Sequence, residues 1–165
     1  MPRIVIAVVC AAAACLLLAA PSPAGSKSFK FEGRTSQCPA DQGRCGDVAI
    51  RLSGSLRRVT TFFIEFQARC ENASTPVSDA ITARDIPATV AAHTVKFNTQ
   101  DTSTLDLGNG YSGDVTAQLA GRIRAASGNG SGTLQLDIAV KDGSGRQVDT
   151  CSTGRLPVGW KVKVV

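Results

Sequence analysis

His93 is the only histidine of the chain, and it limits the acid–base chemistry that can be expected. A Ser/His/Asp or Cys/His mechanism needs a histidine as its general base, so any such site would be built around this residue. Its neighbours Ala91, Ala92 and Thr94 include no acid. The sequence therefore predicts an ordinary polar role for His93 at the start of a strand, and a hydrolase using His93 is an alternative hypothesis.

Three carboxylates, Asp101, Asp106 and Asp114, flank or enter a Gly/Asn-rich segment from Leu105 to Gly113. Carboxylate oxygens are the ligands that calcium prefers, but the D-x-[DN]-x-[DN]-G register of an EF-hand is not met. Hydrolysis of glycosides would need one acid in a shielded setting, and the segment is polar throughout. We expect a solvated loop here and no catalytic residue, metal or cofactor, with a hydrolase using these aspartates as the alternative.

The cysteines are predicted to form disulfides. Four of them lie beyond the N-terminal leader: Cys38, Cys45, Cys70 and Cys151. Their spacing includes neither the C-x2-C pairs of a zinc site nor a redox C-x-x-C. Four cysteines allow three pairings. The short polar segment between Cys38 and Cys45, and the apolar position of Cys70, favour Cys38–Cys45 and Cys70–Cys151.

Residues 1–24 have the pattern of a secretory signal peptide. Arg3 precedes an apolar run of about 17 residues, Ile4 to Ala20, and small residues lead to a cleavage site after Ala24. A membrane anchor is the alternative, since the run is at the lower limit for a span. Export leads to an oxidising space in which disulfides form. We therefore expect a secreted, extracellular protein with one domain over residues 25–165; the Ala-rich leader is typical of bacteria.

The charge is +5, but the basic residues are scattered along the chain: Arg51, Arg57, Arg58, Arg69, Arg122, Arg124, Lys161 and Lys163. They form no dense run and have no interleaved aromatic residues, which single-stranded nucleic acids require for stacking. The distribution argues against nucleic acid as a partner. It is typical of solvated strand faces, with attraction to an anionic surface such as wall polymer or lipid headgroups as the functional interpretation.

Apolar residues recur at every second position, the period of half-buried strands, and no helix pattern follows residue 25. The longest predicted strands are Val48–Leu52, Phe62–Cys70, Val115–Ile123, Leu134–Val140 and Val158–Val164, with shorter ones at Phe29–Phe31 and Val95–Phe97. Strands that are polar on one face indicate an antiparallel β-sandwich of about seven to nine strands. Between them, 72–76 is predicted as a loop, and 81–86 as a strand or a turn of helix.

The aromatic residues are mostly assigned to the core. Phe62, Phe66, Phe97 and Trp160 fall on the inward phase of their strands, which leaves two candidates for exposure, Phe63 and Tyr111. Two exposed rings are too few for a sugar-stacking platform, so a lectin is not predicted.

An ordered series of motifs covers nearly all of the chain beyond the leader: Phe31-Glu32-Gly33-Arg34-Thr35-Ser36-Gln37, Arg58-Val59-Thr60, Cys70, Gly110-Tyr111-Ser112-Gly113, and Cys151-Ser152-Thr153-Gly154 before Trp160. The series resembles a secreted β-rich domain of uncharacterised bacterial exported proteins. The resemblance implies a single sandwich in which Cys70 pairs with Cys151, with Cys38 and Cys45 as an insertion. It implies no activity.

The leading functional hypothesis is an exported, non-catalytic module that binds an unknown cell-surface or extracellular ligand, as a monomer or weak oligomer. Rigid sandwiches present function on loops, so the contact regions are expected around Cys38–Cys45 and Leu107–Gly113. Besides the hydrolase, an inhibitor of exported enzymes is an alternative, with the Cys38–Cys45 loop as its inserted element.

Overall fold

The computed structural model describes residues 27–38, 44–154 and 157–165. These residues form nine strands: β1 (Phe29–Thr35), β2 (Asp47–Leu52), β3 (Arg58–Cys70), β4 (Val77–Ala91), β5 (Thr94–Gly108), β6 (Tyr111–Arg124), β7 (Asn129–Lys141), β8 (Gln147–Ser152) and β9 (Val158–Val164). The predicted signal peptide, residues 1–24, lies outside the described residues. In the described part of the chain, no helix is long and apolar enough to cross a membrane.

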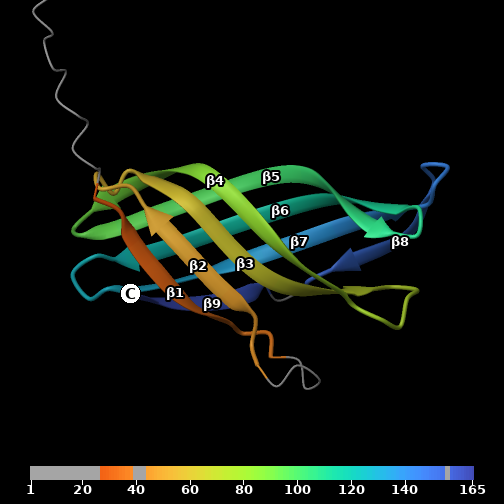
Figure 1. The fold of residues 1–165 in the computed structure, drawn as a ribbon, viewed down its shortest axis with the longest axis horizontal. Helices are drawn as coiled ribbons and strands as arrows, with labels where there is room; N and C mark the ends of the chain where they lie inside the picture. Colours follow the sequence, from red (N-terminus) through yellow and green to blue (C-terminus); the bar gives the residue numbers. More distant parts are fainter. Residues whose placement is uncertain (1–26, 39–43, 155–156) are drawn as a thin grey trace, which may run out of the picture.

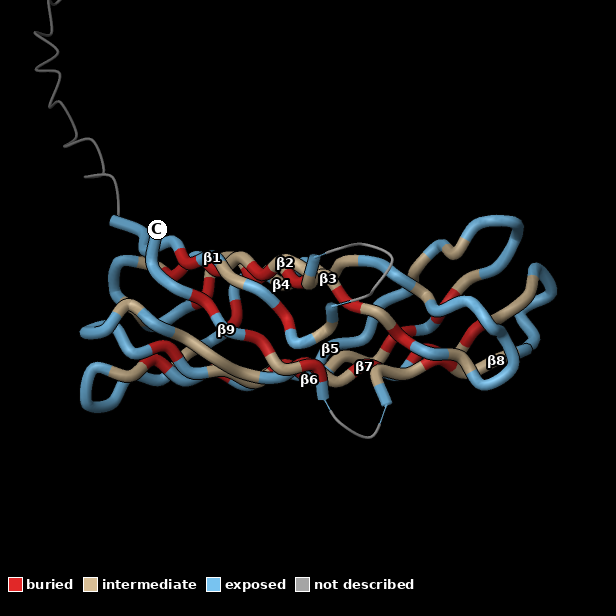
Figure 2. Tube along the Cα trace, turned by 90° about the horizontal axis from the view of Figure 1, so that it is seen from below, coloured by how far each residue is buried: buried red, intermediate tan, exposed pale blue. Residues whose placement is uncertain are grey.

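All strand pairings are antiparallel, and the sheet closes on itself. The strand order is β2-β1-β9-β7-β6-β5-β4-β3-β8, with additional pairings β2–β3 and β7–β8. Figure 2 shows two layers, with β1 to β4 in one and β5 to β7 in the other, and with buried residues between them. The structure thus confirms the predicted antiparallel β-sandwich.

The core lies between the layers and follows the predicted alternation. On β3, Phe62, Ile64, Phe66 and Ala68 are buried, while the residues between them are partly exposed. Trp160 packs edge-on against Phe62, with ring centroids 5.5 Å apart. The inward phase predicted for these strands from the sequence is therefore confirmed.

Residues 81–86, predicted as a strand or a turn of helix, belong to the strand β4. Two strands, β5 and β8, differ from the prediction. β5 continues to Gly108, so the segment predicted as a loop is the tip of the β5–β6 hairpin. Asn109 and Gly110 form its turn with φ angles of 52° and 79°, which asparagine and glycine tolerate. β4 pairs with β5 only over residues 88–91, and the second half of β5 is mostly exposed and polar. The short strand β8 was not predicted.

Both predicted disulfides are present, Cys38–Cys45 and Cys70–Cys151. Cys70 ends β3 and lies directly opposite Cys151 of β8. The second disulfide therefore joins two strands that share only two residue pairs, at the end of the molecule where the sheet ladder is shortest.

Candidate binding surface

His93 lies in a tight turn, away from any depression. With Ala92 it forms the two-residue connection between β4 and β5, and both residues have positive φ angles, 46° and 61°. The side chain is exposed, and the backbone oxygen accepts the N–H of Ala125 at 2.9 Å. Among the described residues, His93 thus belongs to an exposed turn and lines neither of the two depressions described below.

The three aspartates named from the sequence do not converge. Strand alternation directs Asp101 to the face opposite Asp106. Asp106 accepts the N–H of Gly108 at 2.8 Å within its own hairpin, and Asp114 on β6 forms an ion pair with Lys141. Their carboxylates are therefore engaged separately, which gives no support to a shared calcium or catalytic site.

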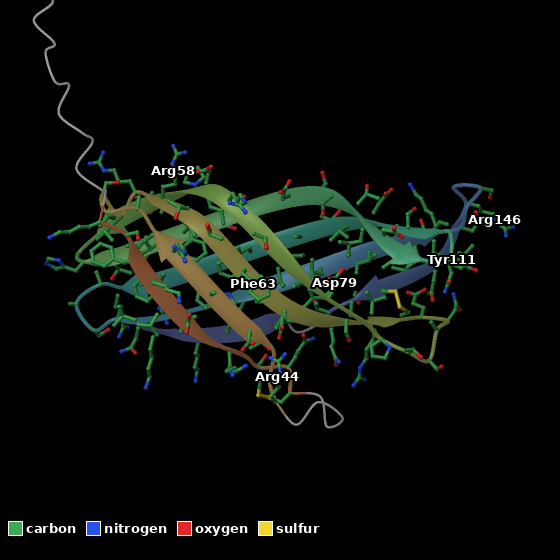
Figure 3. All side chains as sticks on the ribbon, viewed as in Figure 1. Arg44, Arg58, Phe63, Asp79, Tyr111 and Arg146 are labelled. Atoms are coloured by element: carbon green, nitrogen blue, oxygen red, sulfur yellow. A yellow bond between two sulfur atoms is a disulfide. The ribbon has the colours of Figure 1, made fainter. Side chains whose placement is uncertain are left out.

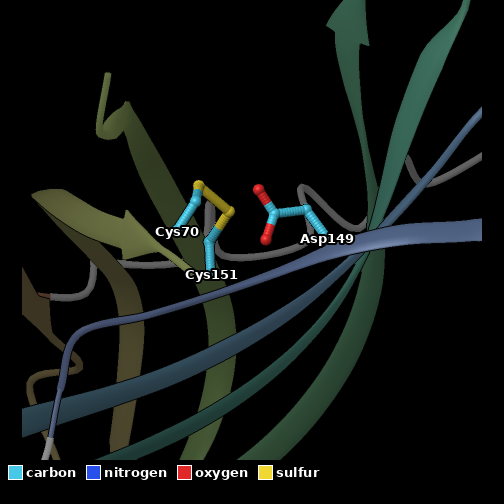
Figure 4. Close-up of side chains that lie close together, drawn as sticks. All are labelled: Cys70, Asp149 and Cys151. Carbon is cyan, nitrogen blue, oxygen red and sulfur yellow. A yellow bond between two sulfur atoms is a disulfide. The ribbon is translucent and has the colours of Figure 1, made fainter. Parts of the chain in front are cut away.

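One group of potential metal ligands occurs among the described residues: Cys70, Asp149 and Cys151. Figure 4 shows that the two sulfur atoms are bonded to each other. The Asp149 carboxylate instead accepts the N–H groups of Asn72 and Ala73, each at 3.1 Å. This group is a structural brace for the loop that follows β3.

Compensated charges surround the Cys38–Cys45 disulfide, near the position of Arg44 in Figure 3. Arg44 pairs with Asp47 at 2.9 Å and with Glu65 at 3.1 Å. The N–H of Asp47 donates to Glu65 at 2.8 Å; this bond and the Arg44 guanidinium hold the pKa of Glu65 below its ordinary value. Since each charge has a partner, the cluster serves to fix the disulfide segment on β3.

Gln37 holds the same segment through its side-chain amide. Its Nε2 donates to the carbonyl of Gln67, and its Oε1 accepts the N–H of Gln67, both at 2.7 Å. A depression of about 570 Å³ lies beside these groups. Gln37, Arg44 and Glu65 in its lining are already engaged with protein groups.

Strand pairing aligns cations in two rows on the outer face of the sheet. In the first row, Lys96 of β5 lies opposite Arg122 of β6, Arg122 opposite Ser131, Ser131 opposite Lys161 of β9, and Lys161 opposite Arg34 of β1. In the second row, Arg124 lies opposite Asn129, which lies opposite Lys163. We call Lys96, Arg122, Arg124, Lys161 and Lys163 the basic surface.

The basic surface borders a broad open depression of about 1620 Å³. Small residues occupy its floor beside the cation rows; they include Ala120, Thr133, Gly159 and Ser36. The aromatic residues below the floor, Phe97 and Trp160, are 4% and 2% exposed and face the core. The depression is therefore bordered by cations, its lining is mostly apolar, and it holds no exposed aromatic ring.

The five cations form no ion pairs within the described part of the chain. The two nearby carboxylates are already paired, Glu32 with Lys30 and Asp47 with Arg34. Like charges placed directly opposite each other on paired strands are destabilising, and Lys96 faces Arg122 in this way. Lys161 faces Arg34, which is paired with Asp47, and Lys163 faces Glu32. An arrangement that opposes folding in this way indicates a surface suited to a negatively charged ligand.

The sequence did not reveal this surface. Four of its residues were noted among the scattered cations, whereas the contact regions were expected at two loops. Lys96 and Lys163 are far apart in the chain, and only the pairing of β5, β6, β7 and β9 brings their rows together. A useful signal was the repetition of Lys or Arg at alternate outward positions, Arg122 with Arg124 and Lys161 with Lys163.

A scan of protein-family models finds no match to this chain, and a search of curated proteins finds no relative. The resemblance to exported bacterial β-rich domains stays a prediction. The functional argument therefore depends on the surface itself.

Proposed function

We propose that this protein is an exported, non-catalytic binding module that holds a linear anionic polymer along its basic surface. The main observation behind this proposal is that unpaired cations are aligned across neighbouring strands beside an open depression. The two disulfides support export, because such bonds form and persist in oxidising compartments.

The extent of the cation rows favours a polymer over a small anion. The unpaired cations of the first row span four strands, β5, β6, β7 and β9, which at the usual strand spacing is about 14 Å. The two rows are separated by two residues along each strand, or about 7 Å. A small anion would contact one or two of these cations, whereas a chain with repeated charges can contact the whole row.

The chemistry of the groove favours an acidic polysaccharide or a phosphate polymer over a nucleic acid. Single-stranded nucleic acids bind through exposed aromatic rings on which their bases stack, and Phe97 and Trp160 are buried below the floor. A hydroxyl group and an amide group lie between the cations, from Ser131 and Asn129. These groups can donate hydrogen bonds to carboxylate or phosphate oxygens.

The test compares two double variants with equal loss of charge. Arg122→Gln/Lys161→Gln removes the centre of the first row, and Arg69→Gln/Arg84→Gln removes two exposed arginines on β3 and β4. Binding to polygalacturonate, to long-chain polyphosphate and to single-stranded DNA is measured by calorimetry at several salt concentrations. We expect salt-dependent binding to one or both of the first two polymers, weakened about tenfold or more by the first variant only.

Equal weakening by both variants would mean that net charge alone attracts the polymer, and would contradict a defined site. Preferential binding of single-stranded DNA would contradict the proposed ligand class and identify a nucleic acid as the ligand. The first variant also has a stability readout, since removal of like-charged neighbours should raise the free energy of unfolding by up to about 0.5 kcal/mol.

A further inference from the structure

Four apolar residues are exposed at the end of the sandwich that carries the C-terminus, whose place Figure 1 shows. Phe29, Val90 and Val164 occupy inward positions, in phase with the buried Phe31, Ile86 and Val162, but they lie beyond the packed core. They are 41%, 43% and 52% exposed, and Val165 is 66% exposed. We call these four residues the apolar end.

Backbone hydrogen bonds bring the parts of the apolar end together. The N–H of Val165 donates to the carbonyl of Lys30 at 3.0 Å, and that of Val164 donates to the carbonyl of Gly128 at 2.7 Å. Gly128 is the last residue of the β6–β7 turn. The turn begins with Ala125, whose N–H donates to the carbonyl of His93 in the β4–β5 turn. The start of β1, the C-terminus and two turns therefore form one continuous tip.

Cations surround this tip, and most have no carboxylate partner. Lys27, Arg57, Arg124 and Lys163 are exposed and have no ion pair within the described residues. The two carboxylates in the region are engaged, Glu32 with Lys30 and Asp85 with Arg58, which Figure 3 labels toward this end. The tip thus combines apolar side chains with a cationic rim.

We propose that the apolar end docks on an anionic lipid bilayer, with its side chains between the headgroups and its cationic rim against them. Apolar residues beside lysine and arginine are the combination that binds membrane interfaces, and the rim complements a negative surface potential. A second copy of the chain fits less well, because it would bring two cationic rims together. This proposal does not rest on polymer binding; it would place the basic surface next to the membrane.

The test uses the exported, disulfide-bonded protein, whose N-terminus is determined by mass spectrometry. Its co-sedimentation is measured with vesicles of phosphatidylcholine alone and with vesicles that also contain about 30% phosphatidylglycerol. Val90→Ser/Val164→Ser alters the apolar end. The matched control, Tyr111→Ser/Val148→Ser, alters exposed residues at the opposite end, which are 45% and 37% exposed. Because all four side chains are exposed, each variant is expected to fold, and thermal unfolding checks this.

We expect binding to the anionic vesicles that falls about tenfold in the first variant and is unchanged in the control. Raising salt from about 0.05 to about 0.5 M should weaken it. A second measurement compares the tryptophan fluorescence of Val164→Trp and Val148→Trp. Brominated lipid should quench the emission of Val164→Trp more than that of Val148→Trp.

Absence of binding to anionic vesicles, or equal loss in the control, would overturn the proposal. Binding that survives Val90→Ser/Val164→Ser but is lost in Arg122→Gln/Lys161→Gln would assign the headgroups to the basic surface instead. A concentration-dependent dimer that Val90→Ser/Val164→Ser abolishes, without vesicle binding, would identify a second copy as the occupant.

Discussion

The two ends of the sandwich are stabilised in different ways. At one end, β3 and β8 share only two residue pairs, and the Cys70–Cys151 disulfide and the hydrogen bonds of Asp149 hold them. At the other end, β1, β2, β7 and β9 pair over most of their lengths. The comparison shows that the disulfide linking distant strands occurs where the ladder is short, whereas the Cys38–Cys45 disulfide joins residues of the β1–β2 connection. Where the ladder is continuous, side chains on the surface are free to carry unpaired charge and exposed apolar groups.

The largest expected effect is loss of the Cys70–Cys151 disulfide. In the chain-entropy model, a separation of 81 residues contributes about 4.5 kcal/mol, against about 2.5 kcal/mol for Cys38–Cys45. We therefore expect Cys70→Ser/Cys151→Ser to lower the free energy of unfolding more than Cys38→Ser/Cys45→Ser, as measured by urea denaturation. Equal losses would contradict the larger contribution expected of the Cys70–Cys151 disulfide.

The end with the continuous ladder should be sensitive to backbone crowding. A Cβ atom on Gly33 would lie 1.8 Å from the carbonyl oxygen of Lys161, whereas one on Gly159 would lie 3.5 Å from its nearest neighbour, Ser36 Oγ. We expect Gly33→Ala to destabilise the protein by about 3 kcal/mol, because β1 and β9 must separate. Gly159→Ala, the matched control, should be neutral or stabilising by up to about 1 kcal/mol.

Thermal and urea unfolding of both alanine variants measures this difference. A Gly33→Ala protein as stable as Gly159→Ala would contradict the close approach of β1 and β9.

A smaller effect is expected from acid at the disulfide end. Partial burial raises the pKa of Asp149, but the N–H groups of Thr150, Asn72 and Ala73 outweigh this, so the pKa lies below its ordinary value of 3.8. A lowered pKa in the folded state adds stability that is complete above the unfolded value and is lost as pH falls through the folded one. The unfolding free energy should therefore decrease below about pH 4, and less steeply in Asp149→Asn.

Urea denaturation between about pH 3 and pH 6 measures this slope. The same slope in the wild type and in Asp149→Asn would show that other carboxylates cause the acid sensitivity.

Local patterns in the sequence predicted most of the fold. The alternation in Phe62–Cys70 and in Val158–Val164 identified the strands and their buried faces, and the position of Cys70 on an apolar face agreed with its pairing to Cys151. The prediction was wrong for Leu105–Gly113, because the half of β5 that leads into it has no partner in β4, is mostly exposed and so lacks an apolar signal. It missed β8 because Gln147, Val148 and Asp149 show no clear alternation.

The sequence by itself determined which side of each strand is apolar, because neighbouring residues on a strand point to opposite faces whatever the strand pairs with. Only the tertiary structure decided which cations become neighbours, because register depends on pairing between distant segments. Arg122 and Lys161 belong to one row since β7 lies between their strands with Ser131 in register. The apolar end likewise depends on where the layers stop covering each other, which leaves the inward residues Phe29 and Val164 exposed.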